Sequence, residues 1–269
     1  DTSKFFERKH KNNNVEKFKV RKNISSINFL DLNWKDNFST KKISFIDTVL
    51  PIIAYENQKI IIERKKIFEI KNYLELNKTL LDRDIKYLRK ISEKYKVLQN
   101  NRHKIDIIND LLISVNIIPN SIVLSQAINE SGWGTSRFAK EYNALFGQYT
   151  YDKTNGVIPF DREVGKKHFI KNFSSIEKSV ESYFKNINSH YAYKNFRNTR
   201  NNYYTIKEIN NNIKSLTQTL DVYAEDNNYV KTINAIIDSN KLYQFDYLFN
   251  NFIKSWLVIK LMAKPTPFS

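Results

Sequence analysis

Cysteine is absent from this chain of 269 residues, and glycine and proline each occur only five times. Without cysteine the chain has no disulfide, no thiolate nucleophile and no cysteine-ligated metal. Sandwiches and barrels need a special turn residue every eight to twelve positions or so, and the scarcity of glycine and proline therefore argues against an all-β protein. We expect a mainly helical fold, because 41% hydrophobic residues supply enough apolar surface for a core.

Long apolar runs are also missing. The longest candidate, Phe245 to Met262, is interrupted by charged and polar residues, so no stretch reaches the roughly 18 apolar residues that a membrane span needs. The interrupting residues are Asp246, Asn250, Asn251, Lys254 and Lys260. The chain begins at Asp1 with neither a Met nor a signal segment, which would suit a form whose leader has been removed.

Acidic residues are too few to balance the basic ones. Lys and Arg number 44 against 28 Asp and Glu, which gives a formal net charge of +16. Such a charge attracts polyanions, among them nucleic acid, an anionic membrane surface and the carboxylate-bearing bacterial wall. The basic residues are spread over most of the expected helices, and the chain carries no nucleic-acid recognition motif. We therefore expect no nucleic-acid partner. An anionic wall or membrane surface remains a possible partner.

Apolar periodicity divides the chain into four segments. Residues 1–40, rich in Lys and Asn, predict a flexible or wrapping arm, and residues 41–100 predict a helical extension. Residues 101–245 form the main domain, and 246–269 form a tail. Helical stripes run from Ile43 to Leu76, where Pro51 should bend or split the helix. Further stripes comprise Ile85, Leu88, Ile91, Tyr95 and Leu98, and then Ile105, Ile108, Leu111, Leu112 and Val115.

Helix boundaries in the main domain carry their own signals. Pro119, Asn120 and Ser121 begin a helix that is apolar on nearly every face, and it should end at Gly132. Two capping boxes, Ser174 with Glu177 and Thr205 with Glu208, predict later helix starts. The last long helix should begin near Asp226 and carry Val230, Ile233, Ile236 and Ile237.

All five glycines fall between residues 132 and 165, so sharp turns are concentrated in one region. Within it, Val157 to Phe173 has strand-like features on both sides of a turn near Gly165. We therefore predict a short β-hairpin there, as a small β-lobe beside the helices.

The segment ESGWGTSRFAKEYNALFG, Glu130 to Gly147, places a single carboxylate at the last turn of the apolar helix. Burial and the negative end of the helix dipole both favour the protonated form of such a carboxyl group. A carboxylic acid that keeps its proton near neutral pH can protonate a glycosidic oxygen. Trp133, directly after a glycine turn, could lie flat against a sugar ring.

The wider stretch AINESGWGTSRFAKEYNALFGQY resembles the glucosaminidase superfamily. It is most similar to the Bax-type proteins of Gram-negative bacteria, more so than to flagellar peptidoglycan hydrolases or staphylococcal autolysins. The resemblance extends to FIDTVLPIIAYENQKIIIERKKI, GKKHFIKNFSSIEKSVESYFKNINSHYAYKNFR and the late segment YAEDNNYVKTI. It covers roughly residues 43 to 245.

This resemblance implies a lysozyme-like, mainly α (α+β) domain with a small β-hairpin lobe and an N-terminal helical extension. It implies a peptidoglycan hydrolase of the cell envelope or periplasm of a Gram-negative bacterium, which cuts the β-1,4 bond after N-acetylglucosamine without a cofactor. Glu130 matches the catalytic acid of the family, and Tyr229 matches its late catalytic Tyr. The substrate-binding positions carried over are Trp133, Phe146, Gly147, Gln148 and Tyr223.

A second carboxylate is the least determined part of the site. Inverting glycosidases place a base about 6.5–9.5 Å from the acid, and retaining ones place a nucleophile at about 5–5.5 Å. Glu163 and Asp161 of the predicted hairpin are the candidates, and Glu163 is preferred because it is nearer the turn. Some members of the superfamily use one Glu together with neighbouring groups or the acetamido oxygen of the substrate.

Two alternatives stay open at this point. A lytic transglycosylase needs only the one acid and forms an anhydro-muramic product, and a wall-binding or assembly factor would keep the cleft without turnover. Metal chemistry is not expected, because His10, His103, His168 and His190 lack metal-ligand spacing. The sequence does not determine the oligomeric state or a regulatory partner.

Overall fold

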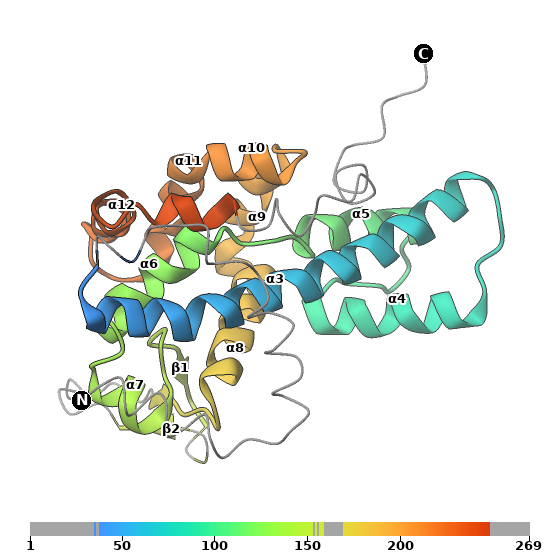
Figure 1. Ribbon diagram of the computed structural model, residues 1–269. Coiled ribbons are helices and arrows are strands. Elements are labelled where there is room, and N and C mark those ends of the chain that lie inside the picture. Colours follow the sequence, from blue (N-terminus) through green and yellow to red (C-terminus); the bar gives the residue numbers. More distant parts are fainter. Residues whose placement is uncertain (1–34, 36–37, 153, 155, 159–168, 248–269) are drawn as a thin grey trace. The chain divides into compact units, whose positions relative to one another are not determined.

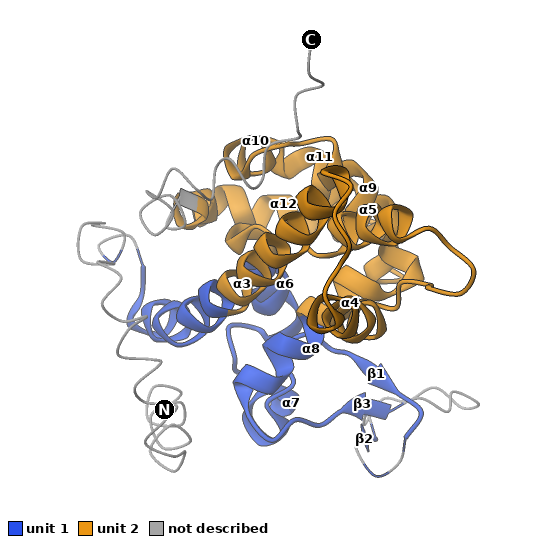
Figure 2. Cartoon of the chain, turned by 90° about the vertical axis from the view of Figure 1, so that its right-hand side faces the viewer, with its two compact units in different colours: residues 1–55, 123–183 blue, residues 56–122, 184–269 orange. Residues whose placement is uncertain are grey.

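A computed structural model describes residues 35, 38–152, 154, 156–158 and 169–247 of the chain (Figure 1). Helices make up most of these residues, with one small antiparallel sheet, which confirms the predicted mainly α fold with a small β-lobe. The chain divides into two compact units. Unit 1 comprises residues 1–55 and 123–183, and unit 2 comprises residues 56–122 and 184–269 (Figure 2).

The first helix, α3, runs without interruption from Thr40 to Glu75 and contains Pro51. Of the two predicted outcomes, two helices or one bent helix, the split into two at Pro51 does not occur, although proline removes one backbone donor from the helix. Apolar side chains on both sides of the proline are buried, and their burial offsets the lost hydrogen bond. They are Val49, Leu50, Ile52 and Ile53. The division between the two units falls within this helix, between Tyr55 and Glu56.

Unit 1 contains a short helix, α7 (Arg137–Tyr142), and a sheet of three strands, besides segments of longer helices. Strands β1 (Tyr149–Thr150) and β2 (Gly156–Val157) both pair antiparallel with β3 (Phe169–Lys171), so β3 is central. The pairing of β2 with β3 confirms the two ends of the predicted hairpin, whereas its turn lies outside the described residues. Strand β1 was not predicted, because two residues carry no alternating pattern.

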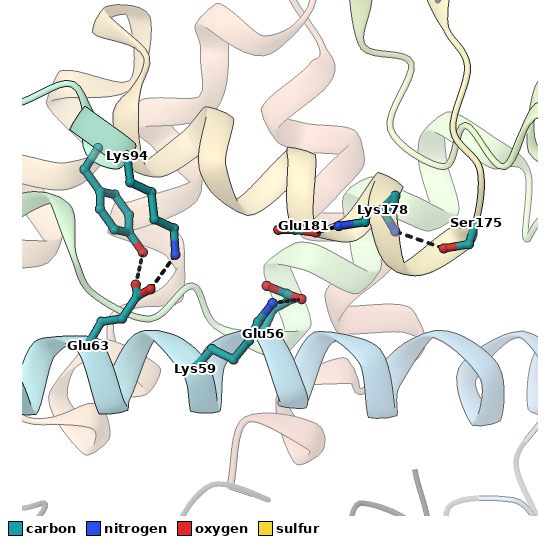
Figure 3. Close-up of polar contacts among 8 residues, drawn as sticks. Glu56, Lys59, Glu63, Lys94, Ser175, Lys178 and Glu181 are labelled. Carbon is teal, nitrogen blue, oxygen red and sulfur yellow. Dashed lines mark hydrogen bonds and ion pairs between the residues drawn. The ribbon is translucent and has the colours of Figure 1, made fainter. Parts of the chain in front are cut away.

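Two further helices, like α3, contain residues of both units. Helix α6 extends from Asn120 to Ser131, and α8 extends from Ile176 to Ser189. All residues of α6 from Asn120 to Ile128 are buried, which confirms the helix predicted to be apolar on nearly every face. At the start of α8 the capping hydroxyl is that of Ser175, whose Oγ accepts from Lys178 N at 3.4 Å (Figure 3). The predicted cap at Ser174 is thus wrong by one residue.

Unit 2 holds the remaining helices. They are α4 (Asp82–Tyr95), α5 (Lys104–Ser114), α9 (Lys194–Asn201), α10 (Ile206–Asn211), α11 (Ile213–Thr217) and α12 (Tyr229–Ser239). Three 3-10 turns, η4 (Tyr191–Tyr193), η5 (Gln218–Tyr223) and η6 (Leu242–Tyr247), connect or follow them.

Most helical stripes of unit 2 pack as predicted. Leu88, Ile91 and Tyr95 of α4 are buried, as are Ile108 and Leu111 of α5. Leu98 is the exception: it is 78% exposed, because α4 ends at Tyr95 and Lys96 adopts a left-handed conformation. The capping box at Thr205 and Glu208 is confirmed, with both hydrogen bonds present. Helix α12 begins at Tyr229, three residues after the predicted start at Asp226.

Two buried arginines bind the carbonyls at the end of α5, and neither pairs with a carboxylate among the described residues. The Arg200 guanidinium donates to the carbonyls of residues 113, 114, 116 and 117 and to Asn188 Oδ1, over 2.8 to 3.2 Å. Arg64 donates to Leu112 O, and to Val115 O at 2.9 Å. Burial lowers the pKa of the Arg64 guanidinium to about 10. These cations occupy the negative end of the α5 dipole and satisfy carbonyls that a helix leaves free.

Polar contacts connect α3 to α4 within unit 2. Glu63 accepts from Lys94 Nζ at 2.5 Å and from the Tyr95 hydroxyl at 2.6 Å (Figure 3). Burial, and then the Glu63 carboxylate, raises the pKa of Tyr95, so its hydroxyl stays a donor. No helix in the described part of the chain is long and apolar enough to cross a membrane.

Candidate active site

Glu130 lies at the last turn of α6, as predicted, and its side chain is half-buried. The helix ends at Ser131, and the chain then reverses through Gly132, where Trp133 N donates back to Ile128 O at 3.3 Å. Gly132 has φ +55°, the left-handed conformation typical of a residue just past a helix end. Asn129 Nδ2 donates to Glu130 Oε1 at 3.2 Å. The turn of the helix thus presents the carboxyl group at the edge of the buried core.

Gly147 lies directly against this carboxyl group, although 17 residues separate the two in sequence. A Cβ placed at Gly147 would be 3.1 Å from Glu130 Oε2, closer than side-chain atoms ordinarily approach. Gly147 also has φ +57°, which strains any other residue. Both constraints require glycine at this position. Its backbone therefore forms one wall of the space around the carboxyl group.

The loop before Gly147 is fixed by three contacts within unit 1. Asn143 Nδ2 donates to Phe173 O at 2.7 Å, and Leu145 N donates to Ser179 Oγ at 3.2 Å. The Phe146 ring, 1% exposed, stacks on the Tyr183 ring with 4.2 Å between centroids. A loop held by backbone and side-chain contacts at successive residues is suited to position a reacting group.

Trp133 has a left-handed backbone, with φ +59°, which is unusual for a residue other than glycine. Its ring packs edge-on against Phe45, 5.7 Å between centroids, and Lys42 Nζ lies 4.8 Å from the ring centroid. Strained backbone of this kind is concentrated at functional sites, where the surrounding contacts maintain it. The predicted contact of Trp133 with a sugar ring stays a prediction.

Gln148 follows Gly147 and precedes β1. Its backbone carbonyl accepts from Lys171 N at 2.8 Å, which ties this residue to the central strand. Its side-chain Oε1 is buried and makes no hydrogen bond within the described residues. A buried acceptor without a donor is costly, so this oxygen, one residue after the glycine that lies against the Glu130 carboxyl group, is suited to accept from a bound ligand.

Tyr223 and Tyr229 belong to unit 2, whereas Glu130 belongs to unit 1. The two tyrosine rings stack in parallel, with 5.5 Å between centroids and an interplanar angle of 10°. Tyr229, at the first position of α12, is 3% exposed. The Tyr223 ring also contacts the Tyr193 ring, with 6.1 Å between their centroids. These residues thus form one aromatic cluster, and their predicted role in the active site stays a prediction.

Glu163 and Asp161, the candidates for a second carboxylate, lie outside the described residues. Among the residues that are described, no group of three His, Asp or Glu side chains could hold a metal ion. Burial lowers the pKa of His190, and the nearby Lys96 and Arg197 lower it further, so this imidazole is neutral at physiological pH.

The buried residues that support the candidate site were not predicted from the sequence. Gln126 is fully buried in α6, and its Oε1 accepts from the Tyr183 hydroxyl at 2.5 Å. A glutamine in an otherwise apolar helix, four residues before Glu130, was the available signal, because buried polar groups need partners. Its partner on α8, 57 residues away, has no local signature.

Comparison with known families identifies the class of protein. Residues 105–242 match the family model for glucosaminidase, described as mannosyl-glycoprotein endo-beta-N-acetylglucosaminidase. The match covers just over half of the chain, and the chain therefore belongs to this glucosaminidase family.

Within that class the chain is similar to the Bax-type proteins. It is 34% identical over 181 residues to protein bax of Escherichia coli K12, an alignment that covers 67% of this chain and 62% of that protein. The chain thus spans less than two thirds of the relative's length. A solved structure, the catalytic domain of the autolysin Auto from Listeria monocytogenes, matches with 21% identity and a TM-score of 0.38. That match covers 62% of this chain and 89% of the other.

Proposed function

We propose that this chain is a peptidoglycan hydrolase that cleaves the β-1,4 bond after N-acetylglucosamine, with Glu130 as the general acid. The observation that carries the proposal is the position of Glu130: half-buried at the last turn of α6, with the Gly147 backbone against its carboxyl group. A carboxyl group held in a fixed, partly desolvated position is what protonation of a leaving glycosidic oxygen requires.

In the proposed reaction, Glu130 gives its proton to the glycosidic oxygen as the bond to the sugar carbon breaks. Water then adds to that carbon, and its proton leaves to a base, so that one water molecule is consumed for each bond cut. Glu163, with Asp161 as the alternative, is the proposed second carboxylate. Tyr229 is proposed to assist catalysis.

Substrate contacts are proposed for residues in the two turns that follow Glu130 and Phe146 in the chain. Trp133 would stack on a sugar ring, Gln148 Oε1 would accept a hydrogen bond from the substrate, and the Gly147 backbone would line the same site. Tyr223 is proposed to contribute from the aromatic cluster of unit 2. Peptidoglycan strands are the proposed partner, in the periplasm or cell envelope, and the charge of +16 favours binding to the anionic wall.

Glu130→Gln is the test of this proposal. The amide keeps the shape of the side chain but has no acidic proton, so wall lysis in a zymogram should fall at least a hundredfold while the circular dichroism spectrum stays unchanged. Glu141→Gln is the matched control, because Glu141 is exposed and pairs with Arg137 at 3.1 Å. A Glu130→Gln protein that keeps more than about a tenth of the activity shows that Glu130 is not the acid.

The choice of second carboxylate has a separate test. Glu163→Gln should abolish the activity on purified peptidoglycan, whereas Asp161→Asn should retain it, since the residue nearer the turn at Gly165 is expected to reach the substrate. Loss of activity in the Asp161 variant alone, or in neither variant, contradicts the assignment of Glu163.

A further inference from the structure

A buried hydrogen bond lies one helical turn behind Glu130. Gln126 and Glu130 are four residues apart in α6, so their side chains leave the same face of the helix. The Gln126 amide is fully buried, and its Oε1 accepts from the Tyr183 hydroxyl of α8 at 2.5 Å. A buried hydrogen bond is directional, so this bond constrains how α8 and α6 meet in unit 1.

The same tyrosine also holds the loop that contacts the acid. The Tyr183 ring stacks on the Phe146 ring at 4.2 Å, with an interplanar angle of 23°. Phe146 immediately precedes Gly147, whose backbone lies against Glu130 Oε2. Ser179, one turn earlier in α8, accepts from Leu145 N at 3.2 Å. Helix α8 therefore contacts this loop through two residues on one face.

We propose that Gln126, Tyr183 and Phe146 form a positioning brace for the acid. The brace runs from the helix that carries Glu130, through the Tyr183 hydroxyl and ring, to the loop whose Gly147 backbone borders the Glu130 carboxyl group. Its three members are buried, so they act on Glu130 through the backbone. The inference rests on the proposed function, because it assigns these residues a role in the same site.

A polar brace achieves what an apolar contact between α6 and α8 would not. Apolar side chains of similar size would fill the space between α6 and α8 equally well. Hydrophobic contacts are not directional, however, so they would not fix the orientation of the side chain at position 183. The hydrogen bond to Gln126 fixes the Tyr183 ring relative to α6, and the stacked Phe146 transmits that position to Gly147. Misplacement of a reacting group by about 1 Å can cost on the order of a hundredfold in rate.

Tyr183→Phe removes the hydroxyl and keeps the ring. In the full-length chain, we expect kcat on peptidoglycan to fall about tenfold with KM changed less than about twofold, because substrate contacts are intact while the acid is displaced. The matched control is Ile187→Val, which trims another fully buried side chain of α8. It should lower the melting temperature by a few degrees at most and leave kcat unchanged.

A double variant separates positioning from stability. Tyr183→Phe combined with Gln126→Met removes both partners of this hydrogen bond, so neither is left buried without the other and the melting temperature should lie closer to that of the wild type than in Tyr183→Phe alone. The directional bond is still missing, so kcat should stay about tenfold low. Recovery of kcat together with the melting temperature, or a single variant with wild-type kcat, overturns the brace.

Hydrogen exchange tests the brace without any substrate. The amides of residues 145–148 should exchange about tenfold faster in Tyr183→Phe than in the wild type, with no such change in Ile187→Val. Unchanged exchange in this loop contradicts the brace. If wild-type protein fails to cut peptidoglycan, the proposed function fails, and the exchange result still decides whether Tyr183 holds the loop.

Discussion

Gly147 combines two structural requirements in one residue. Its left-handed backbone, φ +57°, tolerates no Cβ without strain, and a Cβ there would meet the Glu130 carboxyl group at 3.1 Å. The first requirement concerns stability, and the second concerns the candidate acid. Comparison with a glycine that has only the first requirement can therefore separate the two effects.

Gly147→Ala should destabilise the fold by about 1–2 kcal/mol through backbone strain, and it should also displace the carboxyl group. We expect activity on peptidoglycan to fall at least tenfold at a temperature where the variant is fully folded. Thermal unfolding and zymography measure the two effects.

Gly132→Ala is the control, because Gly132 has φ +55° but its added Cβ would face Thr135 Oγ1, at 3.2 Å. It should show a similar loss of stability and keep most of the activity. Equal losses of activity in both variants would mean that the close contact with Glu130 has no part in catalysis.

At the level of helices, the sequence predicted what depends on local patterns. The apolar periodicity located α4, α5 and α6, and the Thr205 capping box located α10, because these signals lie within one or two turns. The cap of α8 was misplaced by one residue because Ser174 and Ser175 are both suitable, and only the fold selects Ser175. Glu130 was predicted from its helix-end setting and family resemblance. Its supports on α8 were not, because they depend on contacts 34 and 57 residues apart in sequence.

Arg200 donates to backbone carbonyls more than 80 residues away in the sequence, and no local helix pattern predicts such contacts. Arg200→Met would leave four backbone carbonyls and Asn188 Oδ1 without this donor, inside unit 2. We expect a loss of about 3–5 kcal/mol in the free energy of unfolding, measured by urea denaturation. The effect of Arg102→Met, which breaks an exposed ion pair with Asp110, should stay below about 1 kcal/mol. Similar losses in the two variants would show that the carbonyl contacts of Arg200 do not stabilise the fold.

For the whole molecule, Asp246 couples folding to pH. Its buried carboxylate accepts from Ser121 N at 2.8 Å, a contact between residues 125 apart in sequence. Burial raises the pKa of Asp246 from 3.8 to about 7, despite hydrogen bonds with Ser121 and Asn120 that lower it. Because the folded state holds this proton more tightly than the unfolded chain, its contribution to stability is fully present below about pH 3.8. That contribution is lost as the pH rises through 7.

Asp246→Asn should make the free energy of unfolding less dependent on pH between about pH 3.8 and pH 7. The raised pKa corresponds to a change on the order of 4 kcal/mol in the free energy of unfolding between pH 3.8 and pH 7. The asparagine carbonyl can still accept from Ser121 N but does not titrate. Denaturation at several pH values, with Asp238→Asn as an exposed control, measures the difference. An unaltered pH profile in Asp246→Asn would contradict the role of this carboxyl group.

The products of peptidoglycan digestion show whether the chain hydrolyses the bond after N-acetylglucosamine, as we propose. Purified peptidoglycan is digested with wild-type protein, and the released fragments are analysed by mass spectrometry after borohydride reduction. We expect fragments that end in reduced N-acetylglucosamine and carry one added water per cut bond, and we expect none of them with Glu130→Gln. Fragments that end in anhydro-muramic acid would identify a lytic transglycosylase instead, and intact glycan strands would show that the protein binds the wall without cutting it.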